Sequence, residues 1–544
     1  MKSLFKGAAL GLSALLVFGL ASCGEKKAKS NVLNVMVEVE VASLDPQQAV
    51  DGTSFEVIAN FTDGLKQMAG DGSTINALCA EEAVSQDGLT YTFKIREDAN
   101  WANGEPVTAD DFVFGWQRAV DPKIASEYAY MLSDIGQVKN AAEIIAGDLP
   151  VEELGIKALD EKTLQVQLEV PVSYFDSILY FPTFYPVNRK FFESVGDKFG
   201  TSADTVLSNG AFVLTDYQPA AVAFSLKKND KYYDAAKVKL DGLNYQVLKD
   251  SQQALMAYQN GTLDIVKLSG DQVDQVKDDP EFKTIGAGYL WYISPMIEKV
   301  PEFQNLNMRK AFTFAFDRES IVKNVVKDGS MASYTPVPAE FAYNENGEDF
   351  ITAQKEYPEL CDFDAAKALE YYNKAKAELG KDKFTFEMIV DDTTVQQNVA
   401  AVIKEQIEKT LPGVTINLRV QPKKQRVQDM QDGNFELAFT RWGPDYADPM
   451  TYLGMWVTNN PNNYGLWSSS AYDALIDSCV TGKYAQMPKE RWETLKAAEK
   501  IVLEDTVIFP LYQQADACMV KANVSGIEFH PVALNRVYKN TTKN

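Results

Sequence analysis

Histidine is nearly absent from this 544-residue sequence, which contains only His530. Zinc sites, Ser-His-Asp triads and Cys-His dyads all draw on histidine, so a single one argues against each of them. The motifs Gly-x-Ser-x-Gly and His-Glu-x-x-His, which mark two hydrolase classes, do not occur. We therefore expect no catalytic residue, no metal site and no cofactor. We expect His530 to be structural, either satisfied by hydrogen bonds or exposed.

Cysteine is also scarce, and no two cysteines have the Cys-x-x-Cys spacing of a metal knuckle. Cys23 lies near the N-terminus, and the others are scattered along the chain: Cys79, Cys361, Cys479 and Cys518. In an oxidising compartment these last four could form two disulfides. The sequence does not indicate how they would pair.

Basic residues are outnumbered by acidic ones, 53 against 76, which gives a formal net charge of −23. Nucleic-acid binding needs positive charge against the phosphates, so we expect no nucleic-acid partner. The acidity is most simply a solubility feature.

Long hydrophobic runs are missing beyond the N-terminus. Residues 7–21 are apolar and follow the charged start Met-Lys-Ser-Leu-Phe-Lys, but they are too few for a stable transmembrane helix. This arrangement is typical of a signal peptide. It ends Leu-Ala-Ser-Cys at Cys23, which resembles the bacterial lipobox, where the cysteine becomes the first mature residue and is lipidated. We assign 1–22 to a lipoprotein signal peptide and 23–30 to a polar tether. An ordinary signal peptide with an unrelated cysteine is the alternative.

The first half of the remaining chain contains short strands and capped helices. Residues 31–37 alternate as a strand, and 54–61 are predicted to be a helix with Ser54 as its N-cap. Thr108 and Asp111 have the spacing of a capping box at the start of another helix. That helix would bury one face through residues at helical spacing: Phe112, Trp116 and Ala119.

The second half alternates helices and strands. Helices are predicted over 362–379, capped by Asp362 or Asp364 and stopped by Gly380, and over 394–410. Strands are predicted over 384–390 and 414–420. This βαβ pattern indicates an α/β sheet, and the length of the chain indicates two or three domains.

Two aspartates stand out in the segment Arg-Trp-Gly-Pro-Asp-Tyr-Ala-Asp-Pro-Met-Thr-Tyr, which follows a strand predicted over 435–440. Asp448 precedes Pro449, as a helix N-cap does. Asp445 lies beside two aromatic residues, and a carboxylate that loses solvation there needs a cationic partner. If the protein supplies none, a ligand ammonium can. A loop aspartate that bonds its own backbone is an equal alternative from these residues alone.

The stretch from Trp101 to Trp116 resembles the signature of the family 5 extracellular solute-binding proteins, whose members include the oligopeptide- and dipeptide-binding proteins of ABC importers. Further matching segments occur in the family's order: Leu44-Asp-Pro46, Asp121-Pro122, Ser208-Asn-Gly-Ala-Phe212, Met308-Arg-Lys-Ala-Phe312 and Asp445-Tyr446. The resemblance covers most of the mature chain and is closest to the oligopeptide binders.

The resemblance implies an α/β fold of the periplasmic-binding-protein type, a two-lobed clamp (type II) with an additional domain. Lobe I would comprise 31–62, 187–288 and 516–544. The additional domain would be 63–186, and lobe II would be 289–515. The two crossings between the lobes would form a hinge.

For the site, the resemblance implies a ligand that lies extended between the lobes, held by main-chain hydrogen bonds like an added strand. The family aspartate that pairs with the ligand's N-terminal ammonium matches Asp445, which favours the ligand-partner interpretation. The other candidate ligand-binding residues are Trp442, Gly443, Tyr128, Asp51 and Arg441. Trp442 would supply an apolar wall, and Gly443 would allow close backbone approach.

The chain also departs from the family pattern. Some oligopeptide binders hold the peptide's C-terminal carboxylate with basic side chains, and those places fall near Met430 and Phe439 here. Neither residue is basic. Arg441, Lys423 and Lys424 are the nearby substitutes, and the alternative is that these three are solvated surface charges. How the ligand's C-terminus is held, and how long the ligand is, stay open at this point.

The function implied is that of a lipid-anchored, extracytoplasmic binding subunit of an ABC importer. It would be a monomer that carries oligopeptides to the permease subunits, at a cell surface or in a periplasm. Another cargo is the first alternative: a dipeptide, haem, a sugar or a metal chelate such as nickel. A surface hydrolase that works through paired carboxylates and a receptor that kept the binding fold are the others.

Overall fold

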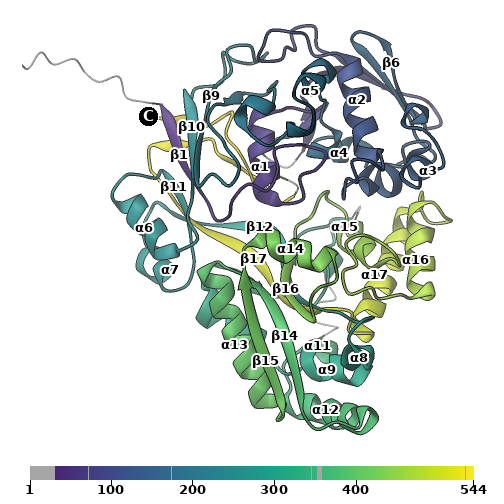
Figure 1. Ribbon diagram of the computed structural model, residues 1–544, viewed down its shortest axis with the longest axis vertical. Helices are drawn as coiled ribbons and strands as arrows, with labels where there is room; N and C mark the ends of the chain where they lie inside the picture. The colour runs from purple at the N-terminus through teal and green to yellow at the C-terminus, as the bar shows by residue number, and fades with distance from the viewer. Residues whose placement is uncertain (1–30, 71–72, 173, 345, 352–357, 533) are drawn as a thin grey trace, which may run out of the picture. The chain divides into compact units, whose positions relative to one another are not determined.

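The computed structural model describes residues 31–70, 73–172, 174–344, 346–351, 358–532 and 534–544. The predicted signal peptide, the tether and Cys23 lie outside these residues. In the described part of the chain, the larger sheet has eleven strands. From one edge to the other they are β15 (Val414–Gln421), β14 (Phe384–Asp391), β16 (Leu437–Trp442), β12 (Phe282–Pro295), β17 (Phe509–Val520), β11 (Ile265–Leu268), β1 (Val32–Val37), β10 (Gly242–Val247), β9 (Ala223–Lys228) and β8 (Phe212–Leu214), while β13 (Met331–Ala332) pairs with β17 (Figure 1).

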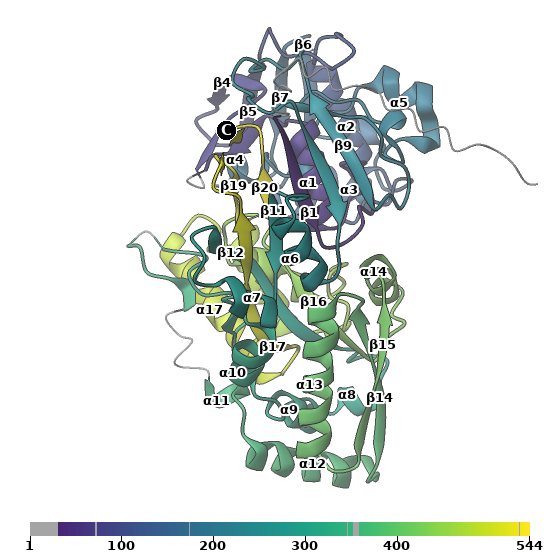
Figure 2. The ribbon, with the colours of Figure 1, turned by 90° about the vertical axis from the view of Figure 1, so that its left-hand side faces the viewer.

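The predicted βαβ unit is confirmed. Strands β14 and β15 pair in parallel from Phe384 opposite Val414 onward, and α13 (Thr394–Thr410) connects them. The buried face of α13 consists of residues at helical spacing: Val399, Ala400, Ile403 and Ile407. Burying such side chains stabilises the packing by roughly 1.5–3 kcal/mol each. Figure 2 shows α13 beside these strands.

Helix α12 (Ala365–Leu379) precedes this unit and is capped by the second of the two aspartates considered. Asp364 accepts hydrogen bonds from the backbone N–H groups of Ala366 and Lys367, both at 2.9 Å. Gly380 ends the helix with φ +64°, a left-handed conformation that glycine adopts without strain.

Two long strands, β12 and β17, connect the halves of the large sheet. β12 pairs with β16 through residues 290–295 and with β17 at both of its ends. Between Gly286 and Leu290 the register with β17 breaks. Gly288 lies in this break with φ +66°, and a Cβ there would lie 2.0 Å from the carbonyl oxygen of Pro531. The break therefore needs glycine.

A separate four-stranded sheet lies within the range predicted for the additional domain. Its order is β4 (Cys79–Val84), β5 (Thr90–Ile95), β7 (Thr163–Gln167) and β6 (Ile156–Asp160). Helix α2 (Ala109–Val120) belongs to the same range and has the predicted capping box, because Asp111 accepts from the N–H of Thr108 at 2.9 Å and Thr108 accepts from that of Asp111 at 3.4 Å. Phe112, Trp116 and Ala119 are fully buried, as their spacing predicted.

The cap predicted for the first helix is wrong. Helix α1 (Gly52–Phe61) begins earlier than expected, and Asp51 is its N-cap in place of Ser54. The Asp51 carboxylate accepts from the N–H groups of Thr53 at 3.0 Å and Ser54 at 3.3 Å. A carboxylate placed ahead of the first turn takes these donors, so Ser54 becomes a first-turn residue whose hydroxyl bonds Asp51.

Residues 31–544 hold together as one compact unit, so the proposed lobe boundaries inside it stay a prediction. Its four cysteines are buried, and in the described chain Cys79, Cys479 and Cys518 form no disulfide with one another. His530 is buried, and its Nε2 atom has no hydrogen-bond partner. Burial lowers the pKa of His530 to about 4, so it is neutral at pH 7 and neither exposed nor fully satisfied. Among the described residues, no helix is both long and apolar enough to cross a membrane.

Candidate functional site: a closed polar cavity

A cavity of about 80 Å³ lies where α1, β16 and α14 (Lys423–Gln431) meet the loop after β16. All six of the predicted ligand-binding residues line it: Asp51, Tyr128, Arg441, Trp442, Gly443 and Asp445. They come from distant parts of the sequence, and the fold brings them together. Met430, a position where relatives were expected to carry a basic residue, lines it as well.

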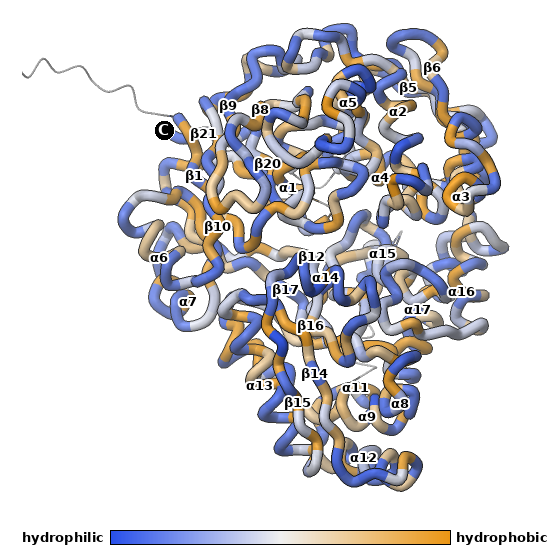
Figure 3. Tube along the Cα trace, in the orientation of Figure 1, coloured by the Kyte–Doolittle hydropathy of each residue, from blue (hydrophilic) through white to orange (hydrophobic). Residues whose placement is uncertain are grey.

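Strand β16 carries two of these residues, Arg441 and Trp442. It pairs antiparallel with β12, with Arg441 opposite Trp291 and Trp442 opposite Leu290. The strand runs two residues further than predicted, over Leu437–Trp442, and its first residues are hydrophobic and buried (Figure 3). The chain then turns, so that the backbone N–H of Asp445 donates to the hydroxyl of Thr451 at 2.9 Å.

Asp445 is a buried carboxylate, with 4% of its surface exposed. Its Oδ2 accepts a hydrogen bond of 3.0 Å from the hydroxyl of Tyr130. No lysine, arginine or histidine of the described chain lies within 4.0 Å of it. Burial raises the pKa of Asp445 to about 8, and the Tyr130 hydrogen bond opposes this shift. The site therefore holds a buried carboxyl group that keeps its proton at pH 7 and would ionise beside a cation.

Asp448, in the same loop, differs from Asp445 because its carboxylate has both a cationic partner and a backbone hydrogen bond. It pairs with both terminal nitrogens of Arg491, at 2.7 and 2.8 Å. It also accepts from the N–H of Met450 at 2.9 Å, at the start of α15 (Met450–Leu453). Asp448 therefore has a structural role, but the N-cap prediction is wrong, because α15 begins one residue later and its N-cap is Pro449.

The carboxylate of Asp51 already has partners within the protein. Besides capping α1, it lies 3.6 Å from Nζ of Lys423. Burial lowers the pKa of Lys423, and the charge of Asp51 opposes that shift. Asp51 therefore lines the cavity as half of an ion pair.

Arg441 has no such counter-charge. Its Nη1 donates to the side-chain oxygen of Gln514 at 2.7 Å, and its guanidinium lies 4.2 Å from the ring centre of Tyr289 and 5.3 Å from that of Trp291. In the described chain, no carboxylate oxygen lies within 4.0 Å of it. Stacking on aromatic rings holds the guanidinium plane in place.

The remaining predicted residues form the walls. A Cβ at Gly443 would lie 2.3 Å from the ring of Tyr289. This glycine is therefore required because a protein side chain packs closely against the backbone. Trp442 donates its indole N–H to the carbonyl of Thr451 at 2.9 Å. Tyr128 packs against Phe55, with ring centres 5.3 Å apart.

Sequence reasoning missed Tyr130 and Tyr289. Tyr130 follows Tyr128 by two residues and bonds Asp445, while Tyr289 lines the cavity beside Arg441 and donates to Asn535 at 3.0 Å. The repeated tyrosine in Tyr128-Ala-Tyr130 was the one local signal for the first. Nothing local marks Tyr289, because its partners lie far away in the sequence.

Comparison with known proteins decides the family. The model for bacterial extracellular solute-binding proteins, family 5 Middle, matches residues 74–464. The chain belongs to the family 5 solute-binding proteins. A dipeptide-binding protein of Lactococcus lactis is 33% identical over 544 residues, covering 96% of this chain and 97% of that protein.

Solved structures agree with this assignment. The substrate-binding domain of an oligopeptide ABC transporter from Bacillus anthracis matches with a TM-score of 0.90 at 36% identity, covering 95% of this chain and 99% of that one. Listeria monocytogenes OppA bound to peptide matches with a TM-score of 0.89 at 35% identity, covering 95% and 100%. This family 5 protein is thus an α/β two-lobed clamp and a transport binding protein, not an enzyme.

Proposed function

We propose that this family 5 protein binds peptides with a free amino terminus and delivers them, as a monomer, to the membrane subunits of an ABC importer. The observation that carries the proposal is the buried, unpaired carboxylate of Asp445. Relatives described as dipeptide- and oligopeptide-binding proteins support a peptide ligand.

The chemistry of the site suits a peptide ammonium. An ammonium opposite Asp445 would supply a positive charge beside a buried carboxylate, where a charge-assisted hydrogen bond is strong. Trp442 and Tyr128 would supply apolar walls for the first side chain. The edge of β16 beyond Ala438, where its pairing with β14 ends, would offer main-chain groups to an extended ligand.

The clamp would close about the two long strands. Lobe I is proposed to consist of 31–62, 187–288 and 516–544, with 63–186 as the additional domain and 289–515 as lobe II. The register break in β12 lies at the proposed lobe I–lobe II boundary, where a hinge needs backbone freedom. Ligand would favour the closed state by its higher affinity for that state. Solution scattering should show compaction on peptide binding, and an unchanged radius with binding confirmed would contradict the clamp motion.

The anchor is proposed from the sequence alone. Lipidation of Cys23 would attach the protein to the outer face of the cell membrane, by burying hydrocarbon in the bilayer. Cys23→Ala should therefore release the protein from membranes. If the variant still partitions fully into a detergent phase, the lipobox assignment is wrong.

The test of the peptide site is a double change. Asp445→Asn keeps the shape and removes the charge, and it should cost about 2–5 kcal/mol of affinity for a short peptide, the range for truncating one member of a buried charged pair. N-acetylating the peptide removes the other partner and should cost a comparable amount. On the Asp445→Asn background the acetyl group should cost much less, because directly coupled losses do not add.

Calorimetric affinities for one peptide and its acetylated form, on both proteins, give the answer. Asp197→Asn is the matched control, because Asp197 is exposed and far from the cavity lining. It should leave both affinities unchanged. If the two losses simply add, Asp445 does not hold the amino terminus.

A further inference from the structure

A second cavity, of about 500 Å³, shares no lining residue with the peptide cavity described above. One wall comes from residues 130–137, in the range assigned to the additional domain. The other comes from residues within 446–481, which include α15 and helix α16 (Ser470–Val480). Small-molecule sites in proteins have volumes of about 300–1,000 Å³, so this cavity is large enough to hold a ligand of its own.

Part of the buried lining of the second cavity is apolar. Four hydrophobic side chains that line it are at most 5% exposed: Ile135, Met450, Met455 and Ile476. Methionine side chains are flexible and polarisable, so they can pack against apolar groups of different shapes. The body of a ligand in this cavity would therefore be apolar.

The charged groups that line the second cavity are all acidic. They are Asp134, Asp473 and Asp477, and none of the described lining residues is lysine, arginine or histidine. Each carboxylate accepts a hydrogen bond of 2.9–3.3 Å from a neutral donor. In the described chain, no basic nitrogen lies within 4.0 Å of any of the three.

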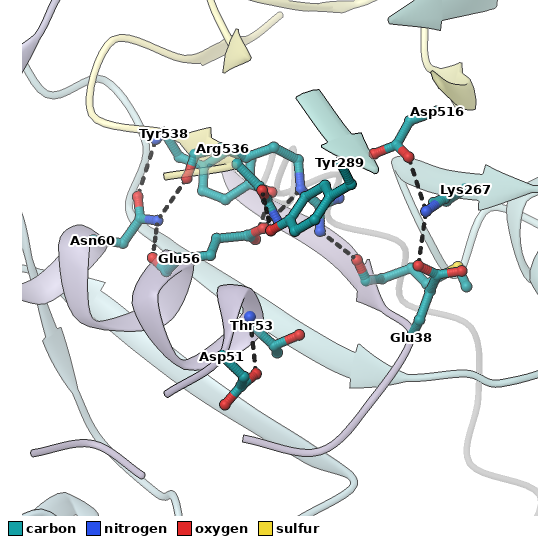
Figure 4. A network of polar contacts seen from close by, with 12 residues as sticks. Glu38, Asp51, Thr53, Glu56, Asn60, Lys267, Tyr289, Asp516, Arg536 and Tyr538 are labelled. Atoms are coloured by element: carbon teal, nitrogen blue, oxygen red, sulfur yellow. Dashed lines mark hydrogen bonds and ion pairs between the residues drawn. The ribbon is translucent and has the colours of Figure 1, made fainter. Parts of the chain in front are cut away.

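Acidic groups beside the peptide cavity have basic partners instead. Lys267 lies 2.8 Å from both Glu38 and Asp516, and Arg536 lies 3.0 Å from Glu56. Figure 4 shows Lys267 between its two carboxylates, with Arg536 beside Glu56. These groups neutralise one another within the protein, whereas the aspartates of the second cavity leave the positive charge to a ligand.

Two of these aspartates are placed unfavourably for the helix that carries them. Asp473 and Asp477 are one turn apart on α16, where like charges repel each other. Asp477 also lies in the last turn, where the helix dipole favours a cation, and that turn contains no basic residue. A bound cation would relieve both effects.

A buried hydroxyl is an independent indication of a ligand. Tyr446 lines the second cavity and is 1% exposed, and its hydroxyl has no hydrogen-bond partner in the described chain. Its ring is stacked on that of Tyr174, with ring centres 5.6 Å apart. A buried polar group without a partner is costly, and a ligand that bonds this hydroxyl would remove the cost.

We propose that the second cavity binds a small organic amine. Its apolar body would pack against the buried methionines, its ammonium would lie among the three aspartates, and a hydrogen-bonding group would reach Tyr446. This site goes beyond the peptide-binding function proposed above and does not depend on it. Because the two walls belong to different proposed domains, a bound amine would contact both of them.

Tyramine, which has an aromatic ring between an ammonium and a hydroxyl, is the probe for the charge. By calorimetry, the wild type should bind it roughly tenfold more tightly than tyrosol, in which a hydroxyl replaces the ammonium. In Asp473→Asn/Asp477→Asn, the two compounds should differ less than about threefold. The matched control is Glu193→Gln/Asp197→Asn, which changes two exposed acids four residues apart that do not line the cavity. It should bind tyramine like the wild type.

Phenethylamine, which lacks the hydroxyl of tyramine, tests the buried end of the site. The wild type should bind it roughly three- to tenfold more weakly than tyramine, the value of one hydrogen bond. In Tyr446→Phe the two amines should bind equally, because the partner of that hydroxyl is gone. This variant loses only an unsatisfied hydroxyl, so its free energy of unfolding should not fall.

Trialanine and Asp445→Asn separate this site from the peptide site. Tyramine should keep its affinity in Asp445→Asn and in the presence of saturating trialanine. If trialanine displaces tyramine, or if Asp445→Asn abolishes tyramine binding, the amine occupies the peptide site and the assignment is overturned. A wild type that does not bind tyramine, or an equal loss in both double variants, also overturns it. Tyramine binding without trialanine binding would support the second site and contradict the peptide function.

Discussion

The hydroxyl of Tyr130 lies 3.0 Å from Oδ2 of Asp445, a residue 315 positions later in the chain. This hydrogen bond is the contact through which the described protein itself satisfies that carboxylate. It lowers the cost of burying the charge, but a neutral donor does not replace a counter-ion. The hydroxyl of Tyr130 should therefore affect peptide affinity without being its main determinant.

Tyr130→Phe tests that role. A hydrogen bond to an ionised group is worth about 1.5–3 kcal/mol, against about 0.5–1.5 kcal/mol for a neutral pair, so the tyrosine favours the state in which Asp445 is charged. We expect the variant to bind a free peptide roughly fivefold more weakly by calorimetry. Tyr233→Phe is the control, since Tyr233 donates a similar bond to Asp63 at 2.9 Å and lines neither cavity. Equal losses in both variants would show that the effect is not local.

Peptide binding should release protons below pH 8. Burial raises the pKa of Asp445 to about 8 in the free protein, and an ammonium beside it must lower that value. Binding therefore expels close to one proton at pH 7, and affinity should fall up to tenfold per pH unit as the pH drops below 8. Above about pH 8 the peptide's own amine loses its proton and affinity falls again. Calorimetry at pH 7 in two buffers of different ionisation enthalpy counts the protons.

The same measurement on Asp445→Asn provides the control for proton linkage. This variant has no carboxyl group at the site, so its heat of binding should not depend on the buffer. A wild type whose binding heat is equally independent of buffer would contradict a raised pKa at Asp445.

Without ligand, Asp445 should destabilise the protein at high pH. Its folded pKa lies above the unfolded value, so the folded state keeps its proton to higher pH and loses stability as the pH rises from about 4 to 8. Asp445→Asn avoids that cost, and its advantage in unfolding free energy should grow over this range by as much as about 5 kcal/mol. Glu499, whose pKa burial also raises to about 8, is present in both proteins and cancels in the difference. Chemical unfolding at pH 5 and pH 8 makes the comparison, and an equal difference at both pH values would contradict it.

The elements that the sequence predicted well are those fixed by local interactions. Helix α13 has its predicted bounds, and the capping box of α2 forms, because both depend on side chains within one or two turns. The cap of α1 was predicted wrongly for a reason that is also local, since two candidate oxygens compete and the carboxylate of Asp51 lies in the better position. Patterns that depend on neighbouring residues can be recognised in the sequence. The sequence does not show which of two similar side chains caps the helix.

The site was predictable only in part. Asp445 and its neighbours lie on one segment, so the family pattern indicated them together. Tyr130, which bonds Asp445, and Tyr289, which lines the cavity, come from remote segments, and their approach depends on the folded arrangement. The contrast between Lys423, which has a carboxylate 3.6 Å away, and Arg441, which has none within 4.0 Å, is equally a matter of three-dimensional distance. Sequence alone gives both residues the same charge and does not show which of them has a carboxylate beside it.

The last prediction concerns a buried ion pair away from the site. Asp45 accepts from Arg118 of α2 at 2.6 and 3.1 Å, and both side chains are nearly inaccessible to solvent. The pair joins the segment after β1 to a helix in the range assigned to the additional domain. Removing one partner of a buried pair leaves an uncompensated charge, so Asp45→Asn should lower the free energy of unfolding by about 3–5 kcal/mol.

Denaturant unfolding measures this loss, with calorimetry to show that peptide affinity of the folded variant is unchanged because neither residue lines the cavity. The matched control is Asp234→Asn, which breaks a pair with Lys237 whose side chains are 35% and 72% exposed. Exposed pairs are worth about 0–1 kcal/mol, because water and salt screen them. An Asp45→Asn variant no less stable than Asp234→Asn would mean that the buried pair does not hold the two segments together. A lower peptide affinity in the folded Asp45→Asn variant would mean instead that the junction positions the clamp.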